Sequence, residues 1–342
     1  MKVLFMPHTV NHYNIGLLST LSNHVSIYTS YNLEKTSIFK RTLPHMKGKK
    51  FILKSFDYLF SPFVDIVHAN SAFQADPVWK VKRTIITSHG FPLPQIEIDP
   101  KYKKYYYKEL HKLKELYNEG VPIISISKFT EEMLERLYNI NSFSIVYHGV
   151  LPSFFINRKN VHSNKVILLY ISRLHPFKEP FILLKAFDKI SRELNNVELV
   201  IKGNGPLLKD VLKFCVKKKL LDKVRLITRK LPFYEFINLF RYAHIFIHTA
   251  RLEPFGLVVL EAMATGLPVI VPKMGGTYEV AGSAGIHFCP GDFNDLSEKI
   301  LKTIYDKKFR YSKSIESIRR AKIFTWEKSA QKYLKIYISL VS

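Results

Sequence analysis

The sequence predicts an α/β protein in which doubly wound, parallel sheets form two Rossmann-like domains. Three observations lead to this prediction. Apolar stretches of strand length alternate with stretches of helical pattern, the strands are apolar along their whole length, and a polar break lies near residues 150–164. Strands that are apolar on both faces are typical of a parallel sheet with helices on both sides. The 342 residues suffice for two domains of ordinary size.

The alternation is clearest in the second half of the chain. Strands are predicted over 166–172, 197–202, 224–228, 245–249 and 269–271, and helices over 180–194, 206–220, 233–242 and from about Gly256 onward. Gly266 and Pro268 follow the last of these helices, as expected of a helix end. In the first half, strands are predicted over 3–6, 25–29, 65–69, 84–88, 123–127 and 144–147.

The composition is strongly basic and poor in cysteine. Lysine and arginine total 52 against 28 acidic residues, a formal charge of +24, which favours nucleic acid, anionic lipid or an anionic substrate as partner. Cys215 and Cys289 are far apart in sequence and form no disulfide framework, so both are expected in cores. We expect a cytoplasmic protein, because two isolated cysteines make a reducing cytosol the default compartment. No apolar run reaches the ~18 residues of a spanning helix.

Residues 253–261 are the most informative stretch. Glu253 and Glu261 bracket a Pro-Phe-Gly turn and an apolar run, and a helix is predicted to start at about Gly256. The free N–H groups and the dipole of a helix N-terminus favour phosphate. Carboxylates beside such a site can accept hydrogen bonds from hydroxyls. Phosphate and polyol recognition together indicate a sugar nucleotide.

The string Glu-Pro-Phe-Gly-Leu, followed by Glu-Ala-Met-Ala-Thr-Gly-Leu-Pro-Val-Ile, resembles the signature of the retaining GT-B glycosyltransferases of family 4. Two carboxylates at this spacing alone would fit a solvated helix face, so the resemblance rests on the composite string. It covers residues 120–342 well and residues 1–120 loosely. It implies two Rossmann-like domains that face a cleft, an acceptor domain at 1–155 and a nucleotide-sugar donor domain at 156–324. A C-terminal helix at about 325–342 would return to the first domain.

The resemblance also implies a set of site residues. The catalytic candidates are Glu253, which would bind the hydroxyls of the donor sugar, and His89, which would contact that sugar. The remaining donor site would consist of the diphosphate-binding residues Arg173, Lys178, Gly256 and Leu257 and the nucleotide-binding residues Glu261, Gly203 and Gly205. Gly16 stands where the family has a two-glycine loop after the first strand, but this chain has one glycine there.

Simpler interpretations accompany several of these residues. Arg173 and Lys178 also fit a solvated basic loop, and Gly203 and Gly205 also fit a tight strand-to-helix turn. Glu279, after Gly275 and Gly276, is interpreted as structural.

No Asp-x-Asp metal motif follows an apolar strand, and Asp292 and Asp295 are interpreted as a loop and a helix cap. We therefore expect neither a metal nor a cofactor. Arg173, Lys178 and the helix N-terminus at Gly256 would supply the positive charge that a metal ion supplies elsewhere.

Two basic regions carry aromatic residues. A helix is predicted over 101–119, with an apolar face (Tyr106, Leu110, Leu113 and Tyr117) beside a lysine stripe (Lys101, Lys104, Lys108 and Lys112). A second patch lies between Phe39 and Phe56. Such patterns fit a peripheral membrane contact, a nucleic-acid contact or a helix whose lysines are merely solvated.

The sequence thus predicts a retaining, metal-independent glycosyltransferase of hexosyltransferase type. Its donor would be a UDP- or GDP-linked sugar and its acceptor the hydroxyl of a glycan or a lipid-linked molecule. One alternative is a nucleic-acid-binding protein on a Rossmann scaffold, which rests on charge alone. The other is a GT-B phosphorylase or a sugar-nucleotide hydrolase.

Overall fold

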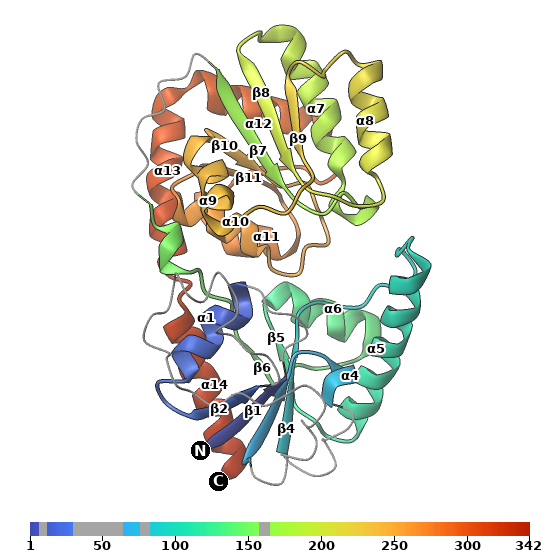
Figure 1. Ribbon diagram of the computed structural model, residues 1–342, viewed down its shortest axis with the longest axis vertical. Coiled ribbons are helices and arrows are strands. Elements are labelled where there is room, and N and C mark those ends of the chain that lie inside the picture. The colour runs from blue at the N-terminus through green and yellow to red at the C-terminus, as the bar shows by residue number, and fades with distance from the viewer. Residues whose placement is uncertain (7–11, 30–63, 76–82, 157–164) are drawn as a thin grey trace. The chain divides into compact units, whose positions relative to one another are not determined.

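The computed structural model describes residues 1–6, 12–29, 64–75, 83–156 and 165–342, and these form two compact units (Figure 1). The first unit contains residues 1–151 and 324–342, and the second contains residues 152–323. Each unit holds a six-stranded sheet whose neighbouring strands are all parallel. Two doubly wound α/β units, as predicted, are therefore confirmed.

The first sheet has the strand order β2-β1-β3-β4-β5-β6. Its strands are β1 (Lys2–Met6), β2 (Ser26–Thr29), β3 (Ile66–Ala69), β4 (Arg83–Ser88), β5 (Ile123–Ser125) and β6 (Ser144–Ile145). The helices of this unit are α1 (His12–Leu21), α4 (Ala72–Ala75), α5 (Pro100–Asn118), α6 (Lys128–Tyr138) and α14 (Trp326–Val341). The chain leaves β1 for β2 on one side and then for β3 on the other, so the strand order reverses beside β1.

Helix α14 completes the first unit through a buried polar network. His68 on β3 places its Nδ1 2.6 Å from the hydroxyl of Tyr337 and its Nε2 2.7 Å from the hydroxyl of Thr87. The Thr87 hydroxyl lies 2.8 Å from that of Tyr333, one turn before Tyr337 on α14. Burial lowers the pKa of His68 to about 3, with a smaller contribution from His89. His68 is therefore neutral at physiological pH and joins the last helix to the first sheet without a charge.

The second sheet has the order β12-β11-β10-β7-β8-β9. Its strands are β7 (Val166–Ile171), β8 (Val197–Lys202), β9 (Val224–Ile227), β10 (Ile245–Ile247), β11 (Val269–Pro272) and β12 (Ile286–Phe288). The longer helices are α7 (Pro180–Glu193), α8 (Leu208–Lys217), α9 (Phe233–Tyr242), α10 (Leu257–Ala264), α11 (Gly275–Ala281), α12 (Phe293–Tyr305) and α13 (Lys307–Ala321), and short 3-10 turns are η3 (Pro152–Phe154), η4 (Pro176–Lys178) and η5 (Gly282–Ala284).

The order of the second sheet reverses between β7 and β10, which pair directly through Leu168 and Ile245. From β7 the chain builds β8 and β9 on one side, and from β10 it builds β11 and β12 on the other. Open α/β sheets bind ligands outside the carboxyl ends of their strands at such a switch point. The segments that follow β7 and β10 are therefore the place to look for a site.

Two details differ from the sequence-based expectations. Gly16, predicted in a loop, lies inside α1, where a Cβ atom would stand 2.2 Å from Nε1 of Trp326. Cys215 is buried as predicted, but the prediction for Cys289 is wrong: it is exposed, because it lies in the turn after β12. The basic patch between Phe39 and Phe56 lies outside the described residues. Among the described helices, none has the length and apolar character needed to cross a membrane.

Candidate active site

Three titratable side chains meet at the switch point of the second sheet. The Nζ of Lys178 lies 2.6 Å from Oε2 of Glu253, and Nε2 of His248 lies 3.1 Å from the same oxygen. Lys178 ends the turn that follows β7, whereas His248 and Glu253 both follow β10. The side chains of Lys178 and Glu253 are 15% and 16% exposed, and that of His248 is 1% exposed. Pairing of β7 with β10 thus brings together residues that are far apart in sequence.

The surroundings of Glu253 keep its carboxylate charged. Burial by itself raises the pKa of this carboxyl group, but the charge of Lys178 and hydrogen bonds from His248 and Lys178 outweigh burial, so the pKa lies well below its usual range. A carboxylate in this state accepts hydrogen bonds and donates none. It suits the recognition of hydroxyl groups.

The backbone of Lys178 is held in place from two sides. The hydroxyls of Tyr170 and Thr249 both donate to the carbonyl oxygen of Lys178, at 3.0 and 2.8 Å. Burial raises the pKa of Tyr170 to about 12, so its hydroxyl keeps the proton that it donates. Glu179, the next residue, has a left-handed backbone with φ of 50° and forms an ion pair of 2.5 Å with Arg251. This arrangement fixes the turn that presents Lys178.

The loop that carries Glu253 rests on the start of α11. The N–H of Gly276 donates to the carbonyl oxygen of Glu253 at 2.7 Å. A Cβ atom at Gly275 would lie 2.5 Å from the carbonyl oxygen of Arg251, and one at Gly276 would lie 2.2 Å from that of Pro254. Both positions therefore require glycine. Gly275 and Gly276 thus allow the Glu253 loop to pack closely against the start of α11.

Helix α10 begins and ends where the sequence predicted. Gly256 is its N-cap residue, with φ of 87°, and a Cβ atom there would stand 2.4 Å from Cγ2 of Thr277. At the other end, the N–H of Gly266 donates to the carbonyl of Met263 and the N–H of Leu267 to that of Ala262, which is the Schellman arrangement. Among the described residues, no side chain caps the N-terminus of α10. Its first N–H groups therefore remain available to an anion.

The other predicted donor-site residues lie in the same unit. Arg173 is half-buried in the loop after β7, Leu257 is half-buried at the first position of α10, and Glu261 is buried one turn further along that helix. Gly203 and Gly205 follow β8, where Cβ atoms would lie 2.0 Å and 2.4 Å from the carbonyl oxygens of Ser172 and Leu174. Contact with that loop gives both glycines a packing reason that requires no nucleotide.

His89 and Gly16 belong to the first unit. His89 is half-buried after β4, and its ring centroid lies 5.4 Å from that of His148. Burial, followed by the charge of His89, lowers the pKa of His148 well below its usual value. The role predicted for His89 stays a prediction.

Asp292 and Asp295 serve as structural residues, as predicted. Asp292 Oδ1 accepts hydrogen bonds from the N–H groups of Asn294 and Asp295 and so caps α12. The carboxylate of Asp295 accepts a hydrogen bond from the N–H of Cys289 at 2.6 Å.

His248 was not among the site residues predicted from the sequence. Thirteen histidines make any one of them a weak signal. The available clue was its position directly after a short apolar strand, at the edge where a parallel sheet presents its ligand-binding residues. Only the structure shows that His248 contacts Glu253.

Comparison with known proteins identifies the second unit. Residues 153–320 match the family described as glycosyl transferases group 1. The chain is 26% identical over 339 residues to an uncharacterized glycosyltransferase of Methanocaldococcus jannaschii, with 94% of this chain and 91% of that protein covered. It is 25% identical over 337 residues to O-antigen chain mannosyltransferase B of Escherichia coli, with 93% and 84% covered.

Solved structures of similar fold cover nearly the whole chain. HepE of Anabaena, in complex with UDP and glucose, matches with a TM-score of 0.74 at 18% identity, over 99% of this chain and 100% of that one. Sucrose-phosphate synthase of Thermosynechococcus elongatus matches with a TM-score of 0.75 at 17% identity, over 99% and 98%. These likenesses establish the GT-B fold. Because residues 153–320 match the glycosyl transferases group 1 family and both relatives are named as glycosyltransferases, the chain is a glycosyltransferase with the GT-B fold.

Proposed function

We propose that this glycosyltransferase transfers a hexose from a UDP- or GDP-linked sugar to an acceptor hydroxyl with retention of anomeric configuration. The observation that carries the proposal is the cluster of Lys178, Glu253 and His248 beside the N-terminus of α10. It combines a cation and free N–H groups, which suit a diphosphate, with a carboxylate held in its charged form, which suits sugar hydroxyls.

The ion pair between Lys178 and Glu253 suggests how the donor is received. When a diphosphate binds, Lys178 exchanges its carboxylate partner for phosphate oxygens, with Arg173 and the N–H groups of Gly256 and Leu257 as further ligands. Glu253 keeps the hydrogen bond between its Oε2 and His248, which fixes its orientation, and its carboxylate accepts a hydrogen bond from a hydroxyl of the donor sugar in place of the one from Lys178. Glu261 binds the ribose. Donor binding thus replaces the ion pair between Lys178 and Glu253 by contacts of Lys178 with the diphosphate and of Glu253 with the sugar.

The chemical step needs a cation more than a base. The bond between the anomeric carbon and the diphosphate oxygen breaks, and the acceptor oxygen forms its bond on the same face of the sugar. The acceptor proton passes to the departing phosphate oxygen. Lys178, Arg173 and the α10 N–H groups stabilise the charge on the leaving group, so the proposal requires neither a metal nor a cofactor.

Two of the similar proteins support this choice of substrates. HepE was solved with UDP-glucose, which supports a nucleoside-diphosphate hexose as donor. The relative named O-antigen chain mannosyltransferase B supports a hexose as the transferred group and a glycan as acceptor. A lipid-linked acceptor remains within the same proposal.

The first test is binding of donors to the purified chain. We expect one member of a panel of UDP-, GDP- and ADP-sugars to raise the melting temperature without added metal, because a ligand of the native state stabilises it. The same donor should fail to stabilise Glu261→Ala. A panel without any effect on the wild-type chain would contradict the proposal.

The second test addresses catalysis. Glu253→Gln should lower kcat/KM by about 100- to 1,000-fold, because an amide cannot supply the negative charge. Glu235→Gln is the matched control, since Glu235 is a surface carboxylate paired with Arg229.

NMR of the product should show the anomeric configuration of the donor; inversion would exclude the retaining step. Free sugar as the main product would identify a hydrolase, and phosphate-dependent glycan cleavage would identify a phosphorylase.

A further inference from the structure

Exposed apolar and cationic side chains gather at the start of α5 and in the loop before it. Four large apolar side chains of this segment are exposed: Ile96 by 42%, Ile98 by 51%, Tyr102 by 44% and Tyr107 by 51%. Lys101, Lys103, Lys104 and Lys108 lie between and beside them and are exposed as well. Apolar side chains that are exposed close together in sequence, with cations among them, are a candidate interaction surface. We call residues 96–108 the α5 patch.

The acidic side chains near the α5 patch are engaged elsewhere. Glu97 is only 3% exposed and accepts a hydrogen bond from the N–H of Asp99, and Asp99 caps α5 by accepting from the N–H of Lys101. Glu109 accepts a hydrogen bond from the N–H of Ala72 at 2.7 Å. These carboxylates therefore bind backbone groups and leave the lysines to dominate the field outside the helix.

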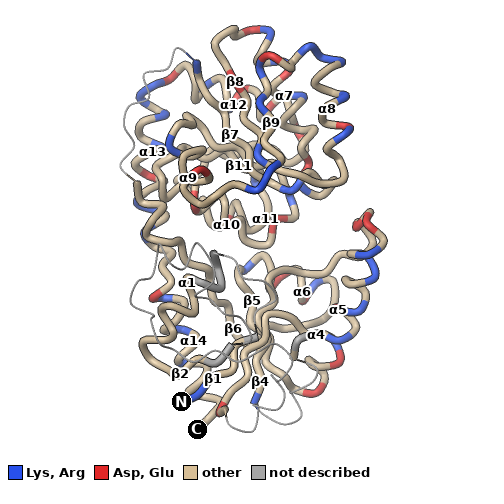
Figure 2. The backbone as a smooth tube through the Cα atoms, in the orientation of Figure 1, with Lys and Arg blue, Asp and Glu red and all other residues tan. Residues whose placement is uncertain are grey.

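The inner side of α5 is already occupied by its own unit. Leu113 and Leu116 are the buried residues of this helix. Positions 104, 107, 108 and 111 are spaced as one helical face, and all four are exposed. Figure 2 shows the lysines spaced along α5. The apolar face named in the sequence analysis thus contributes to the core, and a partner would meet Tyr107, its neighbouring lysines and the isoleucines of the loop.

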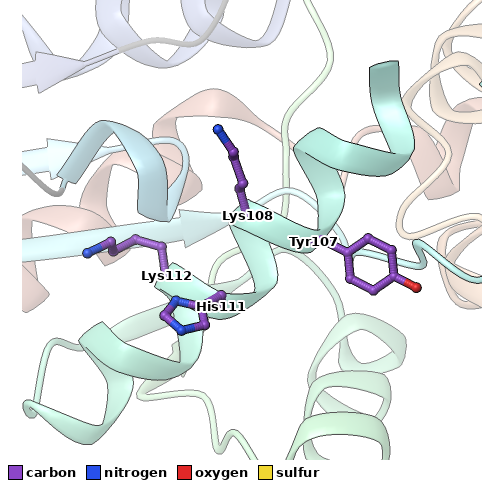
Figure 3. A pocket seen from close by; sticks show the side chains of 4 residues that line it. All are labelled: Tyr107, Lys108, His111 and Lys112. Carbon is purple, nitrogen blue, oxygen red and sulfur yellow. The ribbon is translucent and has the colours of Figure 1, made fainter. Parts of the chain in front are cut away.

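The shape of this surface suits a broad partner. Tyr107, Lys108, His111 and Lys112 line a shallow hollow on α5, and in Figure 3 their side chains point in different directions. Groups that diverge in this way do not close around one small anion.

We propose that the α5 patch docks the enzyme on an anionic phospholipid surface. The lysines would contact phosphate groups, and Ile96, Ile98, Tyr102 and Tyr107 would enter the region between headgroups and acyl chains, as in other interfacial protein segments. Duplex nucleic acid would also attract the lysines, but it offers no apolar layer to Ile96 and Ile98. Exposed aliphatic side chains among cations therefore favour lipid as the partner.

The experiment is flotation of the full chain with lipid vesicles. Binding is expected to vesicles that contain phosphatidylglycerol, to weaken at high salt and to be weak with phosphatidylcholine alone. Each cation near an anionic leaflet changes partitioning about fivefold, so the triple variant Lys103→Gln, Lys104→Gln, Lys108→Gln should bind about 100-fold more weakly. The matched control replaces three exposed cations on α7, namely Lys185, Lys189 and Arg192, by glutamine. Helix α7 has no exposed large apolar side chain, so this variant should bind as the wild-type chain does.

A second variant tests the apolar contact. Ile96→Ser with Ile98→Ser should reduce binding to anionic vesicles by about 10- to 100-fold while duplex DNA binding is unchanged. Both side chains are exposed, so the melting temperature should not fall. Equal losses in the α5 lysine variant and the α7 control variant would show that total charge, not this patch, attracts the membrane. Tight DNA binding that depends on the α5 lysines, with no vesicle binding, would replace lipid by nucleic acid.

Discussion

Each unit has a titratable group, largely shielded from water, near the point where the strand order of its sheet reverses, and one group is charged whereas the other is neutral. In the second unit, Glu253 follows β10 and stays anionic. In the first unit, His68 on β3, the neighbour of β1, stays neutral. Burial penalises the charged form of both. Their partners decide the outcome, because Glu253 faces a cation and His68 faces hydroxyls.

This difference separates a site from a core. A buried ion pair stabilises a protein weakly, since removal of two charges from water offsets most of their attraction. A neutral network such as that of His68, Thr87, Tyr333 and Tyr337 carries no such cost when all its groups are bonded. The charged cluster of the second unit is therefore expected to matter most for binding and catalysis, and the neutral network of the first unit for stability.

Removal of one member of the ion pair between Lys178 and Glu253 should have the largest effect on activity and stability. Lys178→Met should lower kcat/KM by about 100- to 1,000-fold and destabilise the fold by about 3 kcal/mol, because Glu253 loses its cation. Glu253→Gln should destabilise by a similar amount, since it leaves Lys178 unpaired. Calorimetry on both single variants and the double variant tests the charge argument.

The double variant Lys178→Met, Glu253→Gln should be more stable than either single variant, yet just as inactive. Recovery of stability without recovery of activity would separate the electrostatic cost from the catalytic role. Additive stability losses in the double variant would show that the two side chains act independently, against the short distance between them.

Substitution of one glycine from each unit tests how closely the start of α10 is packed. Gly256 and Gly120 have φ of 87° and 82°, but a Cβ atom would meet Thr277 at 2.4 Å at Gly256 and nothing within 4 Å at Gly120. Gly120→Ala should cost about 1 kcal/mol for the left-handed backbone alone. Gly256→Ala should cost about 2–4 kcal/mol and weaken donor binding, because α10 must shift away from α11. Equal losses of stability in the two variants would mean that Thr277 yields without cost.

The pH dependence of stability should reveal the neutral histidine of the first unit. The pKa of His68 is about 3 in the folded chain and 6.5 in its unperturbed form, so between these values the unfolded chain binds the extra proton. Stability is then complete above pH 6.5 and falls as the pH decreases. By pH 5 the loss due to His68 should reach about 2 kcal/mol.

Urea unfolding at pH 7, 6 and 5 checks this expectation against His68→Phe. The variant should be less stable at pH 7, because Thr87 and Tyr337 lose a partner, but its stability should decline less steeply with acidification. His148, which is also buried, leaves a residual slope in both proteins. Parallel curves for wild type and variant would show that His68 does not titrate as its burial implies.

The sequence by itself determined the class of fold and the bounds of helix α10. Apolar strands and helical segments locate nearly every strand of both sheets, because a parallel sheet covered on both faces imposes a pattern that no other arrangement needs. The start of α10 at Gly256 and its end at Gly266 followed from local backbone chemistry. Helix α6 and the placement of Gly16 within α1 were not predicted, although the N-cap residue Ser127 is a local signal for the start of α6.

Only the tertiary structure decided what the site residues touch. Lys178 and Glu253 are separated by 75 positions in sequence, and no local pattern shows that Lys178 and His248 meet at the same oxygen of Glu253. Likewise, only the structure shows that Gly275 and Gly276 are required because they lie against backbone carbonyl groups of the Glu253 loop. It also shows that Ile96 and Ile98 are exposed near the lysines of α5. Local sequence encodes elements through backbone sterics and periodicity, whereas contacts between elements depend on the order in which the strands assemble.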